Sequence, residues 1–151
     1  MPAKALRTWI VVADGARARV MLNEGVGKGL SPVPGLEMVD DNPPTREQGS
    51  DRPGRTHDRM GPGRHAMEPR ADWHRQEKAL FAKSIAERLT AELDRDAFDR
   101  LVLIAPPAAM GDLRAALDDR AHKLVAGEIT KDLTHAGDAE IEDAVGPVLA
   151  V

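Results

Sequence analysis

The segment WIVVADGARARV, at residues 9–20, carries a clear structural signal. Its first half belongs to a nearly continuous apolar run over residues 6–13, rich in β-branched side chains, which predicts a strand covered on both faces. Asp14-Gly15 then predicts a hairpin turn, because glycine accepts the positive φ that such turns require. Residues 18–22 alternate between apolar and polar, so we expect a second strand there.

Outward from this hairpin, short apolar runs alternate with helical patterns. Asp72 can cap a long helix with an apolar face, and Pro106-Pro107 suits the first turn of another. The order predicts one α/β domain over residues 1–151, with a mixed sheet of about five strands packed by about three helices in two or three layers. Beyond the hairpin, we expect strands at residues 36–39, 100–105 and 124–133, and helices at residues 72–95, 106–121 and 138–145.

The composition excludes several classes of protein. The chain of 151 residues has no cysteine, which excludes disulfides, cysteine–zinc sites and thiol nucleophiles. Aromatic residues make up only 3% of the chain, too few for a groove of rings that stack on single-stranded nucleic acid. No run approaches the roughly 18 apolar residues of a membrane span, and the first residues do not resemble a signal peptide. We therefore expect a cytoplasmic protein with no membrane contact and no cofactor.

Residues 42–71, here called the arginine-rich segment, cannot bury themselves in a core. Their central part, REQGSDRPGRTHDRMGPGRH at residues 46–65, contains five arginines and no Val, Ile, Leu, Phe or Trp. The segment holds six arginines against four acidic residues, a net charge of +2, whereas the rest of the chain holds 15 basic and 21 acidic residues, a net charge of −6. A basic segment on an acidic body predicts a local anion site.

Five arginines of this segment are candidate phosphate ligands, because each guanidinium is a planar fork that can bind phosphate through two hydrogen bonds. The alternative is a solvated, disordered loop, since low hydrophobicity with many glycines and prolines is typical of disorder. A loop of 30 residues inside a compact domain is more often functional. The candidate residues for anion or RNA binding are Arg46, Arg52, Arg55, Arg59 and Arg64.

Three other patterns suggest chemistry but fail on detail. GVGKGLS at residues 25–31 lacks the spacing and the following helix of a phosphate-binding P-loop. Asp14, Asp40 and Asp41 lie at predicted strand ends, as in a metal-dependent nuclease, but the strand at residues 100–105 ends without an acidic residue. The histidines match no compact ligand motif, so we predict no metal site; they are His57, His65 and His74, with Asp58 nearby.

Four stretches together resemble the host attachment protein family, whose members are small bacterial proteins described as required for attachment to host cells. They are WIVVADGARARV at 9–20, EQGSDRPGRTHD at 47–58, GRHAMEP at 63–69 and ITKDLT at 129–134. This family is in turn similar to the middle domain of archaeal and eukaryotic peptide-release factors. There, a loop carrying Gly-Gly-Gln precedes a long helix and enters the ribosomal peptidyl-transferase centre.

The resemblance implies a release-factor-like fold in which the arginine-rich segment contacts RNA or the ribosome. This chain has Gln48-Gly49 but no Gly-Gly-Gln, so we expect binding rather than catalysis. A second hypothesis is hydrolysis of peptidyl-tRNA or a phosphoester, with Gln48, Asp51 or His57 positioning water. A third takes the family description literally, as a factor that promotes attachment to host cells.

Overall fold

The computed structural model describes the backbone of residues 6–40 and 62–149 and the side chains of residues 6–40 and 73–149. The predicted α/β class with a mixed sheet is confirmed, and the described residues form six strands and four helices, one of them long. In chain order the elements are β1 (Thr8–Ala13), β2 (Arg17–Asn23), β3 (Ser31–Pro32), β4 (Met38–Val39), α2 (Pro62–Asp94), β5 (Arg100–Ile104), α3 (Pro107–Ala116), α4 (Asp119–Leu124), β6 (Val125–Ile129) and α5 (Asp138–Val145).

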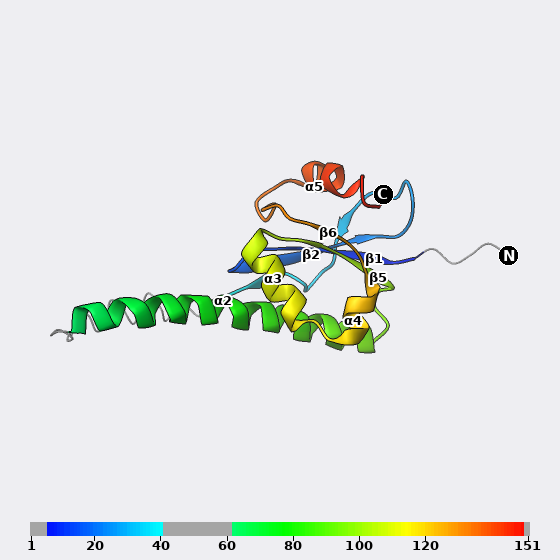
Figure 1. The fold of residues 1–151 in the computed structure, drawn as a ribbon. Helices are drawn as coiled ribbons and strands as arrows, with labels where there is room; N and C mark the ends of the chain where they lie inside the picture. The colour runs from blue at the N-terminus through cyan, green and yellow to red at the C-terminus, as the bar shows by residue number, and fades with distance from the viewer. Residues whose placement is uncertain (1–5, 41–61, 150–151) are drawn as a thin grey trace.

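The sheet has the strand order β3-β2-β1-β5-β6, and β4 also pairs with β2. β1 lies in the middle, antiparallel to β2 and parallel to β5, and β6 continues the parallel part. All six residues of β1 are buried, because β1 has a strand on each side and helices over both faces of the sheet (Figure 1). This burial explains its continuous apolar sequence.

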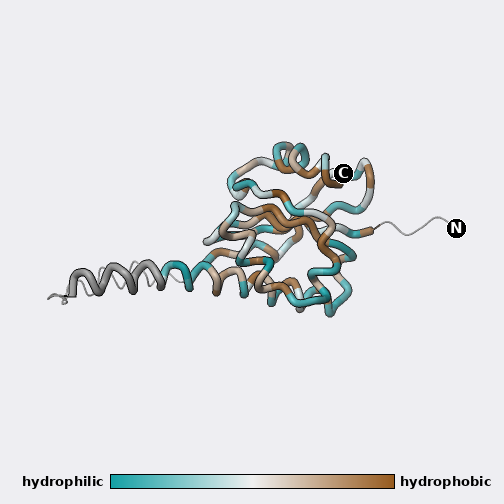
Figure 2. The backbone as a smooth tube through the Cα atoms, viewed as in Figure 1, coloured by the Kyte–Doolittle hydropathy of each residue, from teal (hydrophilic) through white to brown (hydrophobic). Residues whose placement is uncertain are grey.

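The fold has three layers. Figure 1 shows α2, α3 and α4 on one face of the sheet and α5 on the other. Alternate residues of β1 therefore enter two different cores: Val11 packs with the helix α2 side chains, and Ile10 packs with α5. The apolar strands form the centre of the molecule in Figure 2, between helices that are largely hydrophilic outside.

The long helix begins at Pro62 rather than at Asp72. Residues 62–71, expected to belong to the loop, are thus helical. Proline suits the first turn of a helix, so Pro62 is a natural start. The start was hidden because Gly63 and Pro69 are unfavourable in helix interiors.

Three further features of the secondary structure differ from the prediction. The apolar stripe expected to form one helix over residues 106–121 is divided into α3 and α4, because the Asp118 carboxylate accepts a hydrogen bond from Ala121 N at 2.9 Å and starts a new helix. The last strand ends at Ile129, four residues before the expected end at residue 133. The strand β3 was not expected, since two residues are too few for a pattern.

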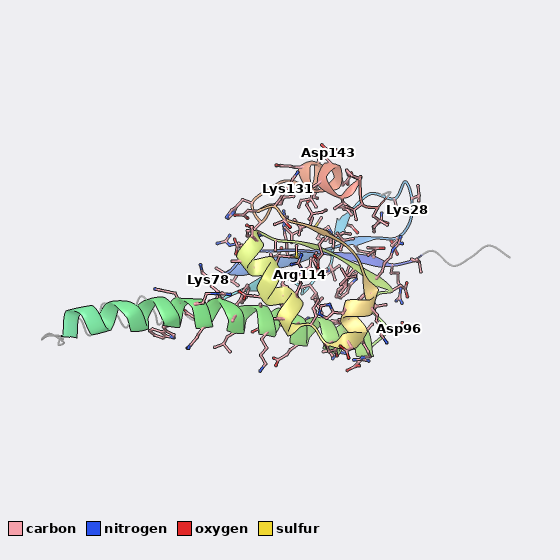
Figure 3. All side chains as sticks on the ribbon, in the orientation of Figure 1. Lys28, Lys78, Asp96, Arg114, Lys131 and Asp143 are labelled. Carbon is pink, nitrogen blue, oxygen red and sulfur yellow. The ribbon has the colours of Figure 1, made fainter. Side chains whose placement is uncertain are left out.

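Helix α2 runs antiparallel to β1. The Lys78 side chain lies against Gly15, just after β1, and Asp96, just after α2, accepts hydrogen bonds from Arg7, just before β1. Figure 3 shows Lys78 and Asp96 near opposite ends of the sheet. The part of α2 before Lys78 therefore extends past the end of β1, by about 24 Å at 1.5 Å per residue.

Candidate functional site

The parallel strands β1, β5 and β6 end on one side of the sheet, here called the C-terminal edge. Open α/β sheets bind their ligands outside the carboxyl ends of such strands. The chain passes from β4 towards the arginine-rich segment at this edge, because the Asp40 N–H donates to Ala16 O in the β1–β2 turn at 2.7 Å. The C-terminal edge is therefore the candidate site.

Asp14 holds the β1–β2 turn, as its sequence context predicted. One carboxylate oxygen, Oδ1, accepts from the backbone N–H of Ala16 at 2.8 Å and of Arg17 at 2.9 Å. The reason predicted for Gly15 was wrong, since its φ is not positive. A side chain at this position would instead meet Lys78, because a Cβ there would lie 3.0 Å from Lys78 Cδ.

The buried hydroxyl of Thr134 joins two carboxylates at the C-terminal edge. Thr134 Oγ1 lies 3.0 Å from Asp14 Oδ2 and 3.0 Å from Asp132 Oδ1. A hydroxyl has one hydrogen, so it can donate to only one of these oxygens at a time. The contact ties the segment after β6 to the turn after β1.

Burial of the Asp14 carboxyl opposes its ionisation, but the N–H groups of Ala16 and Arg17, the Thr134 hydroxyl and the Arg17 charge outweigh this effect. Together they lower the pKa of Asp14 below its ordinary value of 3.8. A group with a lowered folded-state pKa stabilises the fold above its unfolded pKa, and this contribution is lost as the pH falls through the folded pKa.

We expect Asp14→Ala to lower the free energy of unfolding by about 1 kcal/mol at neutral pH, because two backbone donors lose their acceptor and the Thr134 hydroxyl keeps only Asp132. The difference from wild type should shrink as the pH falls below about 4, where the unfolded-state carboxyl becomes protonated, and should be lost below the lower pKa of the folded state. Urea unfolding at neutral and acidic pH measures both effects. Asp14→Asn is the matched control, because it keeps an oxygen at the turn but has no charge to titrate. A difference that stays constant with pH would contradict this role.

A pocket of about 280 Å³ opens beside the β1–β2 turn. Arg17 and Arg19 lie two residues apart on β2, so their side chains share one face of the sheet, the face that α5 partly covers. Residues 134–136 form another wall. The lining residues are Val12, Arg17, Ala18, Arg19, Glu37, Met38, Val39, Thr134, His135 and Ala136.

Most of the sequence-predicted site residues lie outside the described residues. They are Arg46, Gln48, Asp51, Arg52, Arg55, His57 and Arg59, together with Asp41 and Asp58. Arg64 and His65 belong to α2, which is described there by its backbone alone. His74 Nδ1 lies 3.8 Å from Glu77 Oε1 on the same helix. The sequence prediction of phosphate contacts therefore stays a prediction.

Glycine-rich residues 25–31 form a turn rather than a ligand cradle. The buried side chain of Asn23 donates to the carbonyls of Gly25 and Gly29, at 3.0 and 2.8 Å, and accepts from Gly25 N. Leu30 N donates to the Glu142 carboxylate of α5 at 3.2 Å. These residues therefore connect the antiparallel strands β2 and β3.

Among the side chains of residues 6–40 and 73–149, no group of three His, Cys, Asp or Glu residues is placed to hold a metal ion. Across the helices of residues 62–149, none has both the length and the apolar character needed to cross a membrane.

Sequence reasoning missed the residues that gather at the C-terminal edge from distant parts of the chain. Asp14 and Thr134 are 120 residues apart in sequence. No local pattern indicates that contact. Arg17 and Arg19 did carry a usable signal, because residues two apart on a strand lie on the same face.

Most of the chain matches the model of a known protein family. The family model described as "Protein required for attachment to host cells" matches residues 9–145. The chain therefore belongs to the host attachment protein family. A search of curated proteins found no match.

Proposed function

We propose that the protein binds RNA through the arginine-rich segment, which lies between two elements anchored at the C-terminal edge. The observation that supports this proposal is that the chain just after β4 and the helix α2 both contact the β1–β2 turn. On one side, Asp40 N donates to Ala16 O at 2.7 Å. On the other, Lys78 of α2 packs against Gly15. The arginine-rich segment thus follows β4 in the chain and includes the first residues of α2, which extends beyond this edge.

The charge distribution supports a polyanionic ligand. The arginine-rich segment carries a net charge of +2, and the rest of the chain carries −6, so RNA is attracted to one region and repelled elsewhere. The order of strand, arginine-rich segment and long helix resembles the release-factor middle domain, which favours RNA or the ribosome as the ligand. Such a ligand implies a cytoplasmic protein.

Binding should depend on salt because each neutralised phosphate releases counterions. We expect the double variant Arg52→Ala/Arg55→Ala to bind a fluorescein-labelled single-stranded RNA more weakly. Its log–log salt slope should fall by about 1.4, since each phosphate contact to a single strand contributes about 0.7. Fluorescence anisotropy over a series of salt concentrations measures the slope, and cosedimentation with ribosomes tests the larger ligand.

The matched control is Arg95→Ala/Lys123→Ala, which removes the same charge from exposed positions at the opposite end of the domain. This control should leave the slope unchanged. Absence of wild-type binding to both RNA and ribosomes, or an equal fall of the slope in both double variants, would overturn the proposal. Cleavage of peptidyl-tRNA by the wild type, abolished by Gln48→Ala or His57→Ala, would instead identify a hydrolase.

The family description names a cellular outcome, attachment to host cells, rather than a reaction. In this proposal attachment depends on RNA binding by the protein, and this dependence can be tested. Cells carrying Arg52→Ala/Arg55→Ala in place of the wild type should then attach less well, whereas cells carrying the control variant should not.

A further inference from the structure

We propose that the pocket beside Arg17 and Arg19 binds a nucleotide, with the phosphate group against the two arginines. This goes beyond RNA binding by the arginine-rich segment, because the described residues that line the pocket all lie outside that segment. The argument rests on which cations of the domain already have partners and which do not.

Most arginines of the described residues are engaged with carboxylates. Arg75, for example, donates two hydrogen bonds to Asp112, at 2.9 and 2.6 Å. The pairs are Arg7 with Asp96 and Asp99, Arg75 with Asp112, Arg88 and Arg95 with Glu92, Arg114 with Glu128, and Arg120 with Asp94. Such pairs use the donors that would otherwise bind an anion.

The two pocket arginines have fewer such contacts. The exposed guanidinium of Arg17 forms no hydrogen bond or ion pair with the part of the chain that the structure describes. Arg19 donates through Nη2 to Ala136 O, and its Nη1 is 4.0 Å from Asp138 Oδ1. Arg19 Nε is buried without an acceptor among the described residues. The Arg17 guanidinium and Arg19 Nη1, whose contact to Asp138 is long, therefore retain donors for a ligand.

The other residues that line the pocket indicate which groups the ligand carries besides its phosphate. The Glu37 carboxylate can accept hydrogen bonds from sugar hydroxyls or a base amino group, and the exposed His135 ring can donate to an anion. The exposed Val39 adds apolar surface against which a flat ring can lie. A pocket with an apolar wall and a few converging polar groups is typical of small-molecule sites.

The volume of about 280 Å³ suits a ligand of mononucleotide size. Inorganic phosphate alone would leave Glu37 and Val39 without contacts. A nucleoside without phosphate would leave Arg17 and Arg19 without an anion. A free mononucleotide and the 5′-phosphorylated end of an RNA share the chemistry that fits all of these groups.

Isothermal titration calorimetry with adenosine 5′-monophosphate and with adenosine tests the proposal. We expect the monophosphate to bind at least tenfold more tightly than adenosine, because a charge-assisted hydrogen bond to phosphate is stronger than a neutral one. Arg17→Gln should weaken binding of the monophosphate by about tenfold. The matched control is Arg95→Gln, which removes one charge at the far end of α2 and should leave this affinity unchanged.

Arg19→Gln should have a similar effect, but this variant can also disturb the contact to Ala136. The amide NMR signals of the wild-type protein therefore provide a second readout, in which residues 37–39 and 134–136 should shift on adding the monophosphate and residues 95–99 should not. Equal affinity for adenosine and its monophosphate, or shifts confined to other regions, would overturn the proposal.

A comparison of a short RNA that carries a 5′-phosphate with the same RNA that carries a 5′-hydroxyl shows whether the ligand is a free mononucleotide or the end of an RNA. Tighter binding of the phosphorylated RNA than of both the hydroxyl RNA and the monophosphate identifies an RNA end, whereas equal binding of the two RNAs identifies a free nucleotide as the ligand of the pocket. Arg52→Ala/Arg55→Ala should leave binding of the monophosphate unchanged. If that variant loses RNA binding but still binds the monophosphate, the pocket and the arginine-rich segment are separate binding sites. Each of the two proposals can therefore be contradicted without the other.

Discussion

Replacing Phe98 by alanine is expected to lower the free energy of unfolding by about 3–5 kcal/mol. Phe98 is 1% exposed, and its ring centroid lies 4.7 Å from that of Trp9. Removing the ring loses its burial and leaves a cavity beside the indole. Domains of this kind are stable by about 5–15 kcal/mol, so the loss is a large part of the total. Urea unfolding followed by far-ultraviolet circular dichroism measures it.

Phe98→Leu is the matched control, because leucine keeps much of the volume and should cost about 1 kcal/mol. Phe98 precedes β5 at the end of the sheet where Asp99 N donates to Arg7 O, the end opposite the candidate site. Folded Phe98→Leu should therefore bind nucleotide and RNA like the wild type. A loss below about 1 kcal/mol for Phe98→Ala would show that the ring is not a core residue.

Gly127→Ala is expected to cost about 1–3 kcal/mol through overpacking. Gly127 lies in β6, and a Cβ there would be 2.2 Å from Val148 Cγ1. The φ of Gly127 is not in the left-handed region, so alanine meets no backbone strain and the effect comes from this contact alone. Urea unfolding of the single variant gives its size.

The matched test is the double variant Gly127→Ala/Val148→Ala, which removes the side chain that the new methyl group would meet. We expect it to recover most of the stability lost by Gly127→Ala, after allowing for the separate cost of Val148→Ala. A double variant whose loss is simply the sum of the two single losses would show that residue 148 does not pack on β6.

The sequence was a good guide where local physics sets the structure. The apolar run at residues 6–13 indicated a strand buried on both faces, and β1 is buried along its whole length. Asp14 indicated a turn, and its carboxylate caps the two N–H groups of that turn. Pro107 at the start of α3 followed from the same kind of rule.

The sequence was a poor guide where a structure depends on contacts across the chain. Thr134 meets Asp14 only because β6 lies next to β5 and β5 next to β1. The start of α2 at Pro62 was hidden by Pro69, whose local preference opposes a helix. For the site, the composition of the chain identified the arginine-rich segment. Whether the Arg17 guanidinium has a carboxylate partner could not be predicted, because that depends on the position of every carboxylate in the folded chain.

The parallel pairing of β1 with β5 has a consequence for how the chain can vary. Thr8 lies opposite Arg100, so folding closes a loop of 92 residues that includes the arginine-rich segment. The entropy of closure grows only with the logarithm of loop length. Adding about ten residues would therefore raise the cost by only about 0.1 kcal/mol. Loop-closure entropy therefore sets almost no limit on the length of the chain between β4 and α2.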